Sequence, residues 1–576
     1  MRPSNIAFMG LAFGVLLLSA CAAADRQVSQ ESVIVAGAPE PRERDLLAPP
    51  APSPPPPPPA LAYSMPMGKM AAQSMGYGAI APQPGRMAGD IDTEKYPEAR
   101  TSPVKEVKSE PVSTFSIDVD TAAYSNVRRY LNDGVLPPKD AVRVEELINY
   151  FDYDYALPKD KAQPFASTIT MVPSPWAAGK TLLHVGLQGY DIRPAERPPL
   201  NLVLLLDTSG SMNEENKLPL VKKSVRLLVD SLTAKDHVSM VVYAGSAGVV
   251  LEPTAGNDKA KILAALDQLQ AGGSTAGGEG IALAYTMAER HFDKNAINRV
   301  IQATDGDFNV GIADPKRLED FVSRKRESGI YLTELGFGEG NYNDLMMQKL
   351  AQAGNGVAAY IDTLAEARKV LHDQMQSALL PIADDVKIQV EFNPARVAEY
   401  RLIGYETRML NREDFNNDKV DAGEIGAGAN VTAIYELTPV GGKTLIDPLR
   451  YQAATPAGAS MSEIAFLKIR YKPPGAKDSI LIERPVTNAD AKADLATAPE
   501  ATRFATAVAG YGQLLRGDPY TDKAFGWDQV IALANGAKGA DPFGWRSEFV
   551  QLARAAKTAS AAPDPEIAQA PPGLRR

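Results

Sequence analysis

The amino-acid sequence predicts an α/β fold with a doubly wound, mainly parallel sheet, flanked by β-rich segments and followed by C-terminal helices. The first observation is that short apolar runs alternate with segments of helical spacing from Leu200 to about Leu379. Such alternation requires crossover connections, which make neighbouring strands parallel. The second is that strand-like segments precede this region and return from about Pro381. The third is that helical spacing reappears after about residue 500. A chain of 576 residues is also too long for one hydrophobic core, so two or three domains are expected.

The α/β region opens with Leu202–Leu206, a continuous apolar run typical of a strand that is covered on both faces. Apolar residues then recur at helical spacing from Leu218 to Leu232, which predicts the first helix. The further strands expected are "HVSMVVYA", "NRVIQATDG" and "IYLTELGFG". The further helices expected are "DKAKILAALDQL", "GEGIALAYTMAERHF", "PKRLEDFVSRKRESG" and "NDLMMQKLAQAG".

The segments on either side of the α/β region are expected to contain strands and helices of their own. Before it, "VSTFSIDVDTAAYSNVRRYLNDG" predicts a strand and a helix capped at Asp120 or Thr121, and "VRVEELINYFDYDY" predicts a second helix. "PFASTITMVPSPW" and "KTLLHVGLQGY" predict strands. After the region, strands are expected at "DVKIQVEF", "VAEYRLIGY", "NVTAIYELTPV", "AFLKIRYKPP" and "SILIERPV". Helices then follow from "ATRFATAVAGYGQLLRG", whose apolar stripe is expected to be core. Because strands lie on both sides, we expect the α/β domain to be inserted into one supporting unit.

The N-terminus has the features of a secretory signal over residues 1–20, where Arg2 is followed by the apolar stretch "IAFMGLAFGVLLL". Cys21 comes next and is the only cysteine, so no intrachain disulfide can form. "LSAC" resembles the bacterial lipobox, which implies cleavage before Cys21 and its acylation, palmitate included. An ordinary signal peptide that contains a cysteine is the alternative. Residues 21–110 contain "APPAPSPPPPPPA" and show little periodicity, which predicts a disordered, extended linker.

The remaining boundaries follow from shifts in the sequence pattern. A helix and strand segment is expected over 111–197, the α/β domain over 198–379, a β-rich and helical domain over 380–557 and a flexible tail over 558–576. The formal net charge is −10 and no basic cluster with interleaved aromatics occurs, which argues against a nucleic-acid binder. No apolar stretch after the signal is long enough to span a bilayer, so the lipid would be the membrane anchor.

Small oxygen-bearing side chains gather where strands of the α/β region end. Asp207, Ser209 and Ser211 follow the first strand, and Asp305 follows the strand in "NRVIQATDG". Thr275 lies in the glycine-rich loop "GGSTAGGEG". Ligands of open α/β sheets bind beyond the carboxyl ends of the strands, so these loops are expected to meet at one edge. A set of oxygen donors without thiol or imidazole suits a hard cation such as Mg²⁺, which takes about six oxygen ligands.

These motifs resemble the von Willebrand factor type A domain. "DTSGS" matches its D-x-S-x-S motif, Thr275 matches its isolated threonine, and "TDG" matches its distal aspartate. The resemblance implies a metal-ion-dependent adhesion site for Mg²⁺, or for Mn²⁺ or Ca²⁺. By this resemblance, the hydroxyls of Ser209, Ser211 and Thr275 would contact the ion directly or nearly so. Asp207 and Asp305 would act partly through water, and one coordination position would remain for a carboxylate of a partner.

A wider resemblance covers most of the chain after about Glu110. "TFSIDVDTAAYSNVRRYL", "GFGEGNYNDLMM", "NREDFNNDKVDAGEIGAG" and "WRSEFVQLAR" are similar to flanking segments of a bacterial group of envelope lipoproteins that contain this domain. Some members of that group carry a calcium-activated-chloride-channel-like label. Channel activity is not expected here, because nothing after the signal is apolar for long enough to cross a membrane.

Four other segments partly match functional motifs or patches but also have structural explanations. "SIDVDTA" partly matches the nucleophile motif of haloacid-dehalogenase-type phosphatases, but Ala122 occupies its fifth position, so a helix cap is expected. "DFNNDKVDAGE" begins like a calcium loop but lacks its glycine and glutamate, which favours a polar turn and leaves a weak second calcium site open. "GFGEGN" is interpreted as a turn rather than a dinucleotide fingerprint, and "NYFDYDY" as either a recognition patch or core packing. The histidines show no metal spacing, and no G-x-S-x-G motif of a serine hydrolase occurs.

The sequence therefore predicts a lipid-anchored binding protein of the cell envelope, held at the outer membrane and facing the periplasm or the surface. Its cation site would capture an acidic side chain of a protein partner. An enzyme is not expected, because no recognisable nucleophile or general base accompanies the oxygen cluster. Two alternatives stay open: an envelope enzyme that uses the cation to polarise a substrate, and a structural lipoprotein with an idle metal site.

Overall fold

In the computed structural model of the chain, the residues described below belong to the unit that begins at Pro84. The structure describes residues 94–98, 100–159, 162–193, 195–275, 277–306, 314–447 and 461–562. The predicted signal peptide, Cys21 and the Pro-rich part of the linker lie outside the described residues, so their roles stay predictions. Among the helices that the structure describes, none combines the length and the apolar character that crossing a membrane requires.

The α/β domain is built on a six-stranded sheet in the order β10-β9-β8-β5-β6-β7. The strands are β5 (Leu200–Asp207), β6 (His237–Tyr243), β7 (Ala247–Ala255), β8 (Ile297–Thr304), β9 (Ile330–Phe337) and β10 (Ala358–Ile361). Neighbouring strands are parallel, except that β7 runs antiparallel to β6. The chain builds outward from β5 to β7 and then crosses back to β8, which confirms the doubly wound, mainly parallel sheet.

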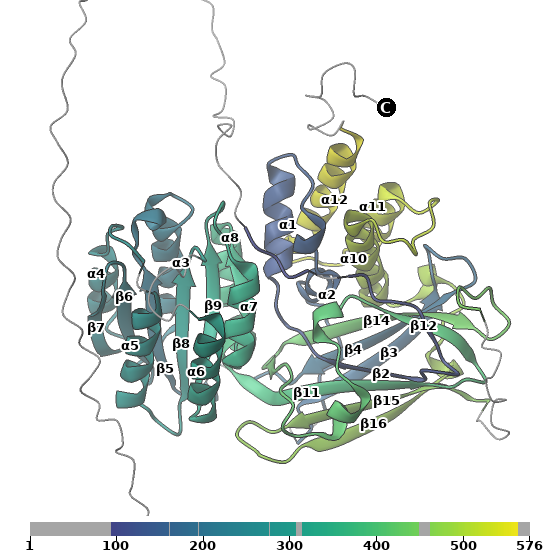
Figure 1. Ribbon diagram of the computed structural model, residues 1–576, viewed down its shortest axis with the longest axis horizontal. Helices are drawn as coiled ribbons and strands as arrows, with labels where there is room; N and C mark the ends of the chain where they lie inside the picture. The colour runs from purple at the N-terminus through teal and green to yellow at the C-terminus, as the bar shows by residue number, and fades with distance from the viewer. Residues whose placement is uncertain are drawn as a thin grey trace, which may run out of the picture. The chain divides into compact units, whose positions relative to one another are not determined.

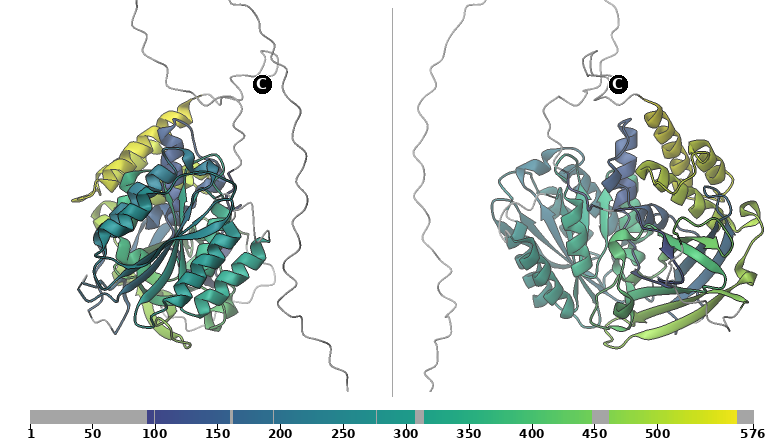
Figure 2. Two further views of the ribbon diagram at one scale, coloured as in Figure 1. Left: turned by 90° about the vertical axis from the view of Figure 1, so that its left-hand side faces the viewer. Right: turned by 45° about the vertical axis from the view of Figure 1, so that its right-hand side comes forward.

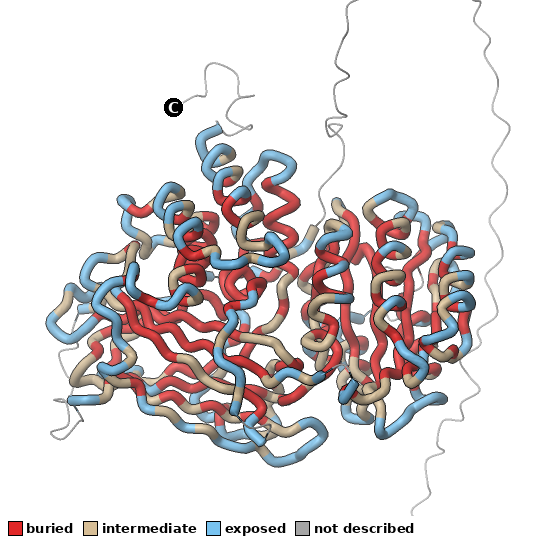
Figure 3. Tube along the Cα trace, turned by 180° about the vertical axis from the view of Figure 1, so that it is seen from behind, coloured by how far each residue is buried: buried red, intermediate tan, exposed pale blue. Residues whose placement is uncertain are grey.

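Helices cover both faces of this sheet, which explains why its central strand is apolar throughout (Figure 1). Leu202 and Leu204 of β5 pack in a cluster with α3 and α4, whereas Val203 and Leu205 pack with α5, α6 and α7. Successive side chains of a strand point to opposite faces, so both faces of β5 are buried. The tube in Figure 3 shows the central part of this domain mostly in red, the colour of buried residues. The helices are α3 (Leu218–Ser231), α4 (Lys259–Asp267), α5 (Gly277–Arg290), α6 (Pro315–Glu327), α7 (Asp344–Ala353), α8 (Leu364–Arg368) and α9 (Met375–Leu379).

The other strands form two antiparallel sheets that pack on each other as a sandwich. One sheet has the order β1-β12-β14-β4-β3, and the other has the order β13-β11-β15-β16 with β2 also paired to β11. Ring contacts between Phe165 and Tyr471 and between Phe392 and Tyr435 join the two sheets. The strands are β1 (Lys105–Glu106), β2 (Val112–Ser116), β3 (Phe165–Pro173), β4 (Thr181–Gly189), β11 (Pro381–Phe392), β12 (Val397–Ile403), β13 (Ile425–Gly426), β14 (Asn430–Pro439), β15 (Glu463–Lys472) and β16 (Ile480–Thr487).

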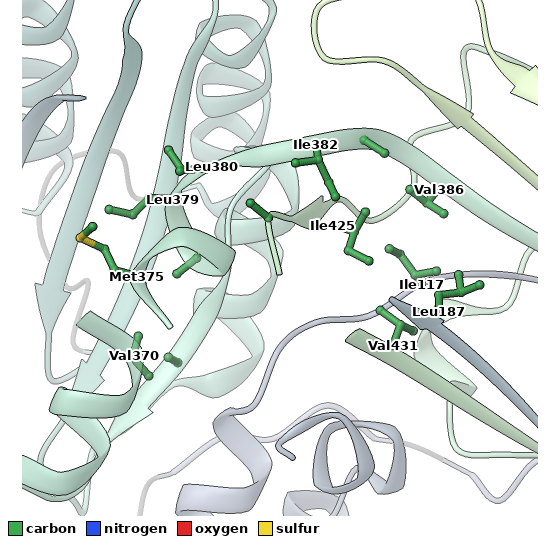
Figure 4. Packing of buried hydrophobic residues seen from close by; sticks show 14 of the residues in the cluster. Ile117, Leu187, Val370, Met375, Leu379, Leu380, Ile382, Val386, Ile425 and Val431 are labelled. Carbon is green, nitrogen blue, oxygen red and sulfur yellow. The ribbon is translucent and has the colours of Figure 1, made fainter. Parts of the chain in front are cut away.

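The α/β domain is an insertion in this sandwich, as the strands on both of its sides predicted. β4, which precedes the domain, pairs with β14, and β2 pairs with β11. One continuous core reaches from the α/β sheet into the sandwich. Figure 4 shows this core continuing from Met375 and Leu379, at the end of the α/β domain, through Ile382 to Val386 of β11 in the sandwich. The inserted domain is therefore seated on the sandwich by apolar packing.

A layer of helices covers the sandwich sheet that contains β4 and β14 (Figure 2). Leu182 and Ile434 of this sheet belong to the same buried cluster as Phe504 and Val508, which confirms that the apolar stripe of α10 is core. His184 of β4 is buried, and its Nε2 lies 3.1 Å from Thr506 Oγ1 of α10. This histidine therefore has a structural role, because it links the sheet to α10. The helices are α1 (Ala122–Asn132), α2 (Val144–Asn149), α10 (Glu500–Arg516), α11 (Trp527–Asn535) and α12 (Trp545–Ala561).

The second predicted helix is shorter than its sequence pattern indicates. α2 ends at Asn149, and the aromatic run after it packs among the helices instead of continuing the helix. Tyr150, Phe151 and Tyr153 are buried, so "NYFDYDY" is core packing rather than a recognition patch. Asp154 has a φ of 53°, a left-handed conformation that no helix can continue through.

Both ends of the folded part extend past the predicted boundaries. Glu94 accepts hydrogen bonds from Arg129 Nη1 and Nη2 at 2.7 Å, and β1 pairs with β12, although the linker was expected to reach residue 110. At the other end, α12 continues to Ala561, beyond the boundary expected at 557. At both ends, residues whose composition is typical of flexible chain are held in place by contacts with the folded part.

Candidate metal centre

The predicted metal residues lie at the carboxyl edge of the α/β sheet, beside the junction of β5 and β8. These two strands are neighbours, but the chain leaves β5 toward β6 and leaves β8 toward β9. Their loops therefore diverge, and in doubly wound sheets this switch point is where a ligand crevice forms. Asp207 is the last residue of β5, and Asp305 directly follows β8.

Asp207 organises the loop that begins at the end of β5. It is fully buried, and its Oδ1 accepts a hydrogen bond from Ser209 N at 2.9 Å. Its Oδ2 accepts a hydrogen bond from Thr304 Oγ1 of β8 at 3.2 Å. Ser209 Oγ and Ser211 Oγ lie 3.0 Å apart. Ser209 is buried and Ser211 is exposed, so this pair of hydroxyls is accessible from one side.

The loop that carries Thr275 is hydrogen-bonded to the loop that carries the two serines. Gly210 N donates to Gly273 O at 2.9 Å, and Gly272 N donates to Thr208 O at 2.8 Å. Gly273 has a φ of +85°, a conformation that glycine adopts without strain. Thr275 is buried just before α5. Three glycines thus allow the two backbones to approach each other and bring Thr275 to this edge of the sheet.

Asp305 reaches the same edge from β8. It is fully buried, and Gly306 after it has a φ of +90°. A Cβ at Gly306 would lie 2.5 Å from Asn343 N, so only glycine fits this turn. Lys217 Nζ donates to Asp305 Oδ2 at 3.2 Å, and both side chains are buried.

Lys217, which was not predicted as part of the centre, occupies the N-cap position of α3. A cation at the N-terminus of a helix is opposed by the helix dipole. A residue that is locally unfavourable often serves a functional site, and this was the available signal.

The electrostatics of the centre favour a bound cation. Burial raises the pKa of Asp207 to about 6, although hydrogen bonds from Ser209 lower it, and the negative charge of Asp305 adds to the increase. Carboxylates that are buried close together repel each other, and a cation between them relieves that repulsion. The donors are all oxygen atoms, which suits Mg²⁺, Mn²⁺ or Ca²⁺ better than a soft metal. The residues therefore fit a hard divalent cation, and the role of each ligand stays a prediction.

The helix cap expected at Asp120 or Thr121 is not formed. Thr121 is at the N-cap position of α1, but its side chain makes no capping hydrogen bond. Asp120 instead accepts hydrogen bonds from Ala358 N and Arg408 Nη2, both at 2.7 Å, and Asp118 accepts one from Arg408 Nε at 3.0 Å. The prediction was wrong because a buried arginine from a distant segment binds both carboxylates, which a local pattern cannot reveal.

The acidic segment "DFNNDKVDAGE" forms a connection between strands, as expected, but two of its carboxylates meet a third from β11. Ligand atoms of Asp385, Asp421 and Glu424 lie within 4.8 Å of one another. Arg326 Nη1 lies 2.5 Å from Asp421 Oδ1, and Lys472 Nζ lies 2.6 Å from Asp385 Oδ2. These ion pairs offset two of the three charges, so the group is explained as a salt-bridge network.

Three family models match the chain. The model described as "von Willebrand factor type A domain" matches residues 201–393, which include both strands that lead to the candidate centre. The model described as "von Willebrand factor" matches residues 90–184. The model described as "Uncharacterized protein YfbK, C-terminal" matches residues 377–559.

Two known proteins and one solved structure illustrate these similarities. The chain is 49% identical over 469 residues to "Uncharacterized protein YfbK" of Escherichia coli, with 80% of each chain covered. It is 30% identical over 171 residues to "Uncharacterized protein sll0103" of Synechocystis, which covers 30% of this chain and 40% of that protein. The structure of a von Willebrand factor type A protein from Catenulispora acidiphila is 16% identical and covers 69% of this chain and 91% of its own, with a TM-score of 0.39.

Proposed function

The chain belongs to the family of bacterial proteins that includes YfbK of Escherichia coli and carries a von Willebrand factor type A domain, and on that premise we propose that it is a binding protein of the cell envelope. Domains of this type often mediate interactions between proteins through a metal-ion-dependent site. In this proposal, the centre at the carboxyl edge of the α/β sheet captures an acidic side chain of a protein partner.

The observation that supports the proposal is the meeting of hydroxyls and carboxylates at the switch point of the sheet. Ser209 Oγ and Ser211 Oγ lie 3.0 Å apart beyond Asp207, and Asp305 is close enough to raise the pKa of Asp207. A divalent cation bound there would supply a Lewis-acid centre that accepts a carboxylate oxygen of the partner as a ligand. The serine hydroxyls and Thr275 would serve as neutral donors, and the two aspartates would balance the charge of the ion.

The hydrogen bonds of the centre favour binding over chemistry. Ser209 Oγ lies 3.0 Å from Ser211 Oγ, and the Ser209 side chain also hydrogen-bonds Asp207. Asp207 is itself a proposed ligand of the cation, so in the loaded centre it would not be available as a base for Ser209. The nearby amine, Lys217 Nζ, donates to Asp305 instead. A transfer enzyme with a serine nucleophile needs a base in contact with that serine. The envelope enzyme is therefore the second candidate, and metal-dependent turnover is the result that would favour it.

The proposal includes a membrane anchor at Cys21. "LSAC" fits a site of cleavage and acylation, and Ala22 after the cysteine lacks the aspartate that often retains lipoproteins at an inner membrane. Pro-rich linkers are generally stiff and extend by about 3.1 Å per residue, and a linker of this kind would hold the folded part away from the bilayer. Labelling of cells with palmitate tests this part, because Cys21→Ser is expected to abolish incorporation and membrane retention.

The main experiment measures capture of a partner by the full chain in Mg²⁺ and in chelator. We expect a partner to be crosslinked in intact cells, to be released by chelator and to be lost in the Asp207→Ala variant. Asp230→Ala removes an exposed aspartate of α3 and is the matched control, which should retain capture. Capture that persists in chelator would contradict the proposal. An absence of Mg²⁺ uptake in titration calorimetry would favour a structural protein with an idle site.

A further inference from the structure

A lysine is built into the candidate metal centre. Lys217 Nζ donates to Asp305 Oδ2 at 3.2 Å, and the lysine side chain is only 5% exposed. Among the residues that the structure describes, no ion pair joins Lys217 to Asp207. The ammonium group therefore pairs with one of the two aspartates and does not bridge them. It can remain in place when a cation is held by the oxygen donors.

The position of Lys217 is fixed by the turn in "GFGEGN", which begins at Gly338 after the end of β9, as the sequence predicted. Gly338 in this turn has a φ of +75°. A Cβ at Gly338 would overlap Cγ, Cδ and Cε of Lys217. The glycine therefore leaves the space that the lysine stem fills, and the turn holds the ammonium group against Asp305.

We infer that Lys217 determines which ligands the metal centre accepts, an inference that rests on the proposed function. Lys217 neutralises the charge of Asp305, so that only the negative charge of Asp207 is left to offset the two positive charges of a bound divalent cation. The loaded centre then keeps one positive charge, and an anionic carboxylate is favoured over a neutral oxygen ligand. Without the lysine, the two aspartates would balance the ion, and this preference would be lost. The same ammonium group repels the metal, so Lys217 weakens metal binding while it strengthens selection of an acid.

The test separates metal binding from ligand binding in the full chain. Lys217→Met keeps the apolar stem and removes the charge, and Lys223→Met removes a lysine that is 56% exposed on α3 as a matched control. Water-proton relaxation measures Mn²⁺ binding first. At saturating Mn²⁺, the same signal follows acetate and acetamide, the charged and neutral probes, as they displace metal-bound water.

We expect Lys217→Met to bind Mn²⁺ about tenfold more tightly or better and to bind acetate about tenfold more weakly, because a unit charge acts from a few ångströms away. Acetamide binding should be unchanged, and Lys223→Met should match the wild type in all three titrations. A purely structural role of Lys217 would not move the two affinities in opposite directions.

A second variant moves the lysine without removing its charge, in case Lys217→Met folds poorly. Gly338→Ala displaces the stem of Lys217 and should weaken acetate binding. Gly340→Ala is its control, because Gly340 has a similar φ of +91° but an added Cβ there meets nothing within 4 Å. Gly340→Ala should bind acetate like the wild type.

The outcomes distinguish this inference from the proposed function. If Lys217→Met binds acetate like the wild type at saturating Mn²⁺, the inference is overturned while the proposed function stands. If acetate and acetamide binding fall equally, the site is merely distorted and the inference is also overturned. If the wild type binds neither Mn²⁺ nor Mg²⁺, both fall together.

Discussion

Replacing Lys369 with methionine should change how the stability of the protein depends on pH. Lys369 follows α8 and is 1% exposed at the contact of the inserted domain with α2 and α12. Its Nζ donates to Tyr150 O at 2.6 Å and lies 4.9 Å from the ring centroid of Trp545. Burial lowers the pKa of Lys369 from 10.5 to about 7, although the charge of Glu366 opposes this shift.

The sign and size of the effect follow from that shift. Since the pKa is lower in the folded state, the stability linked to Lys369 is fully present above pH 10.5 and is lost as the pH falls through 7. Each pKa unit corresponds to about 1.4 kcal/mol, so the wild type loses up to about 5 kcal/mol over this range. Lys369→Met has no such loss. The free energy of unfolding of the variant, relative to the wild type, should therefore rise by about 1.4 kcal/mol per pH unit as the pH falls from 9.5 to 7.

Urea unfolding followed by tryptophan fluorescence measures this difference. All three tryptophans, Trp176, Trp527 and Trp545, lie outside the inserted domain and report on the sandwich and its helices. The prediction concerns how the difference in the free energy of unfolding changes with pH. Methionine also removes a hydrogen bond, and this loss shifts the difference by the same amount at every pH. Lys223→Met, at an exposed position, should show no slope. A difference that stays constant from pH 6 to pH 9.5 would refute the reasoning.

Three further changes have expected outcomes. In thermal unfolding, Mg²⁺ at about 100 times its dissociation constant should stabilise the wild type by about 2.7 kcal/mol and leave Asp207→Ala unchanged; an equal response of both would place the ion elsewhere. Arg128 contacts buried Asp362 and Glu366, so Arg128→Met should cost about 3–5 kcal/mol in urea unfolding, and a cost below about 1 kcal/mol would count against that network. Burial, with the charge of Glu406 adding to it, raises the pKa of Glu145 to about 8, so the stability linked to Glu145 is present below pH 4.5 and is lost as the pH rises through 8. Glu145→Gln should therefore stabilise the protein at pH 9 more than at pH 5, and denaturant midpoints that shift equally at both pH values would contradict this.

The architecture was predictable wherever one strand or helix carries its own signal. β5 was predicted because a strand that is covered on both faces is apolar throughout, and the order of elements follows from the alternation of strands and helices. β7 and β10 were not predicted. β7 is an edge strand that is only partly buried, and β10 has four residues, so neither shows a clear period. Tertiary contacts rather than local patterns define such edges.

The candidate centre was predictable to the extent that its residues share loops with a recognisable motif. Asp207, Ser209 and Ser211 lie close together in sequence, and Asp305 directly follows β8, the neighbouring strand of the sheet. The position of Lys217 at the start of a helix marks it as unusual, but its partner Asp305 is 88 residues away and no local pattern reveals that contact. Asp118 shows the same limit, since Arg408 is 290 residues away.

The insertion of the α/β domain also imposes an order on folding. Ser116 of β2 pairs with Lys387 of β11, so β2 cannot pair with β11 until the chain beyond the inserted domain has been synthesised. During that interval β2 exposes an unpaired edge, which can join other chains. All strands of the inserted domain lie within one continuous stretch of sequence, so this domain can fold first. Nascent chains that end before β14 therefore combine a folded α/β domain with an incomplete sandwich.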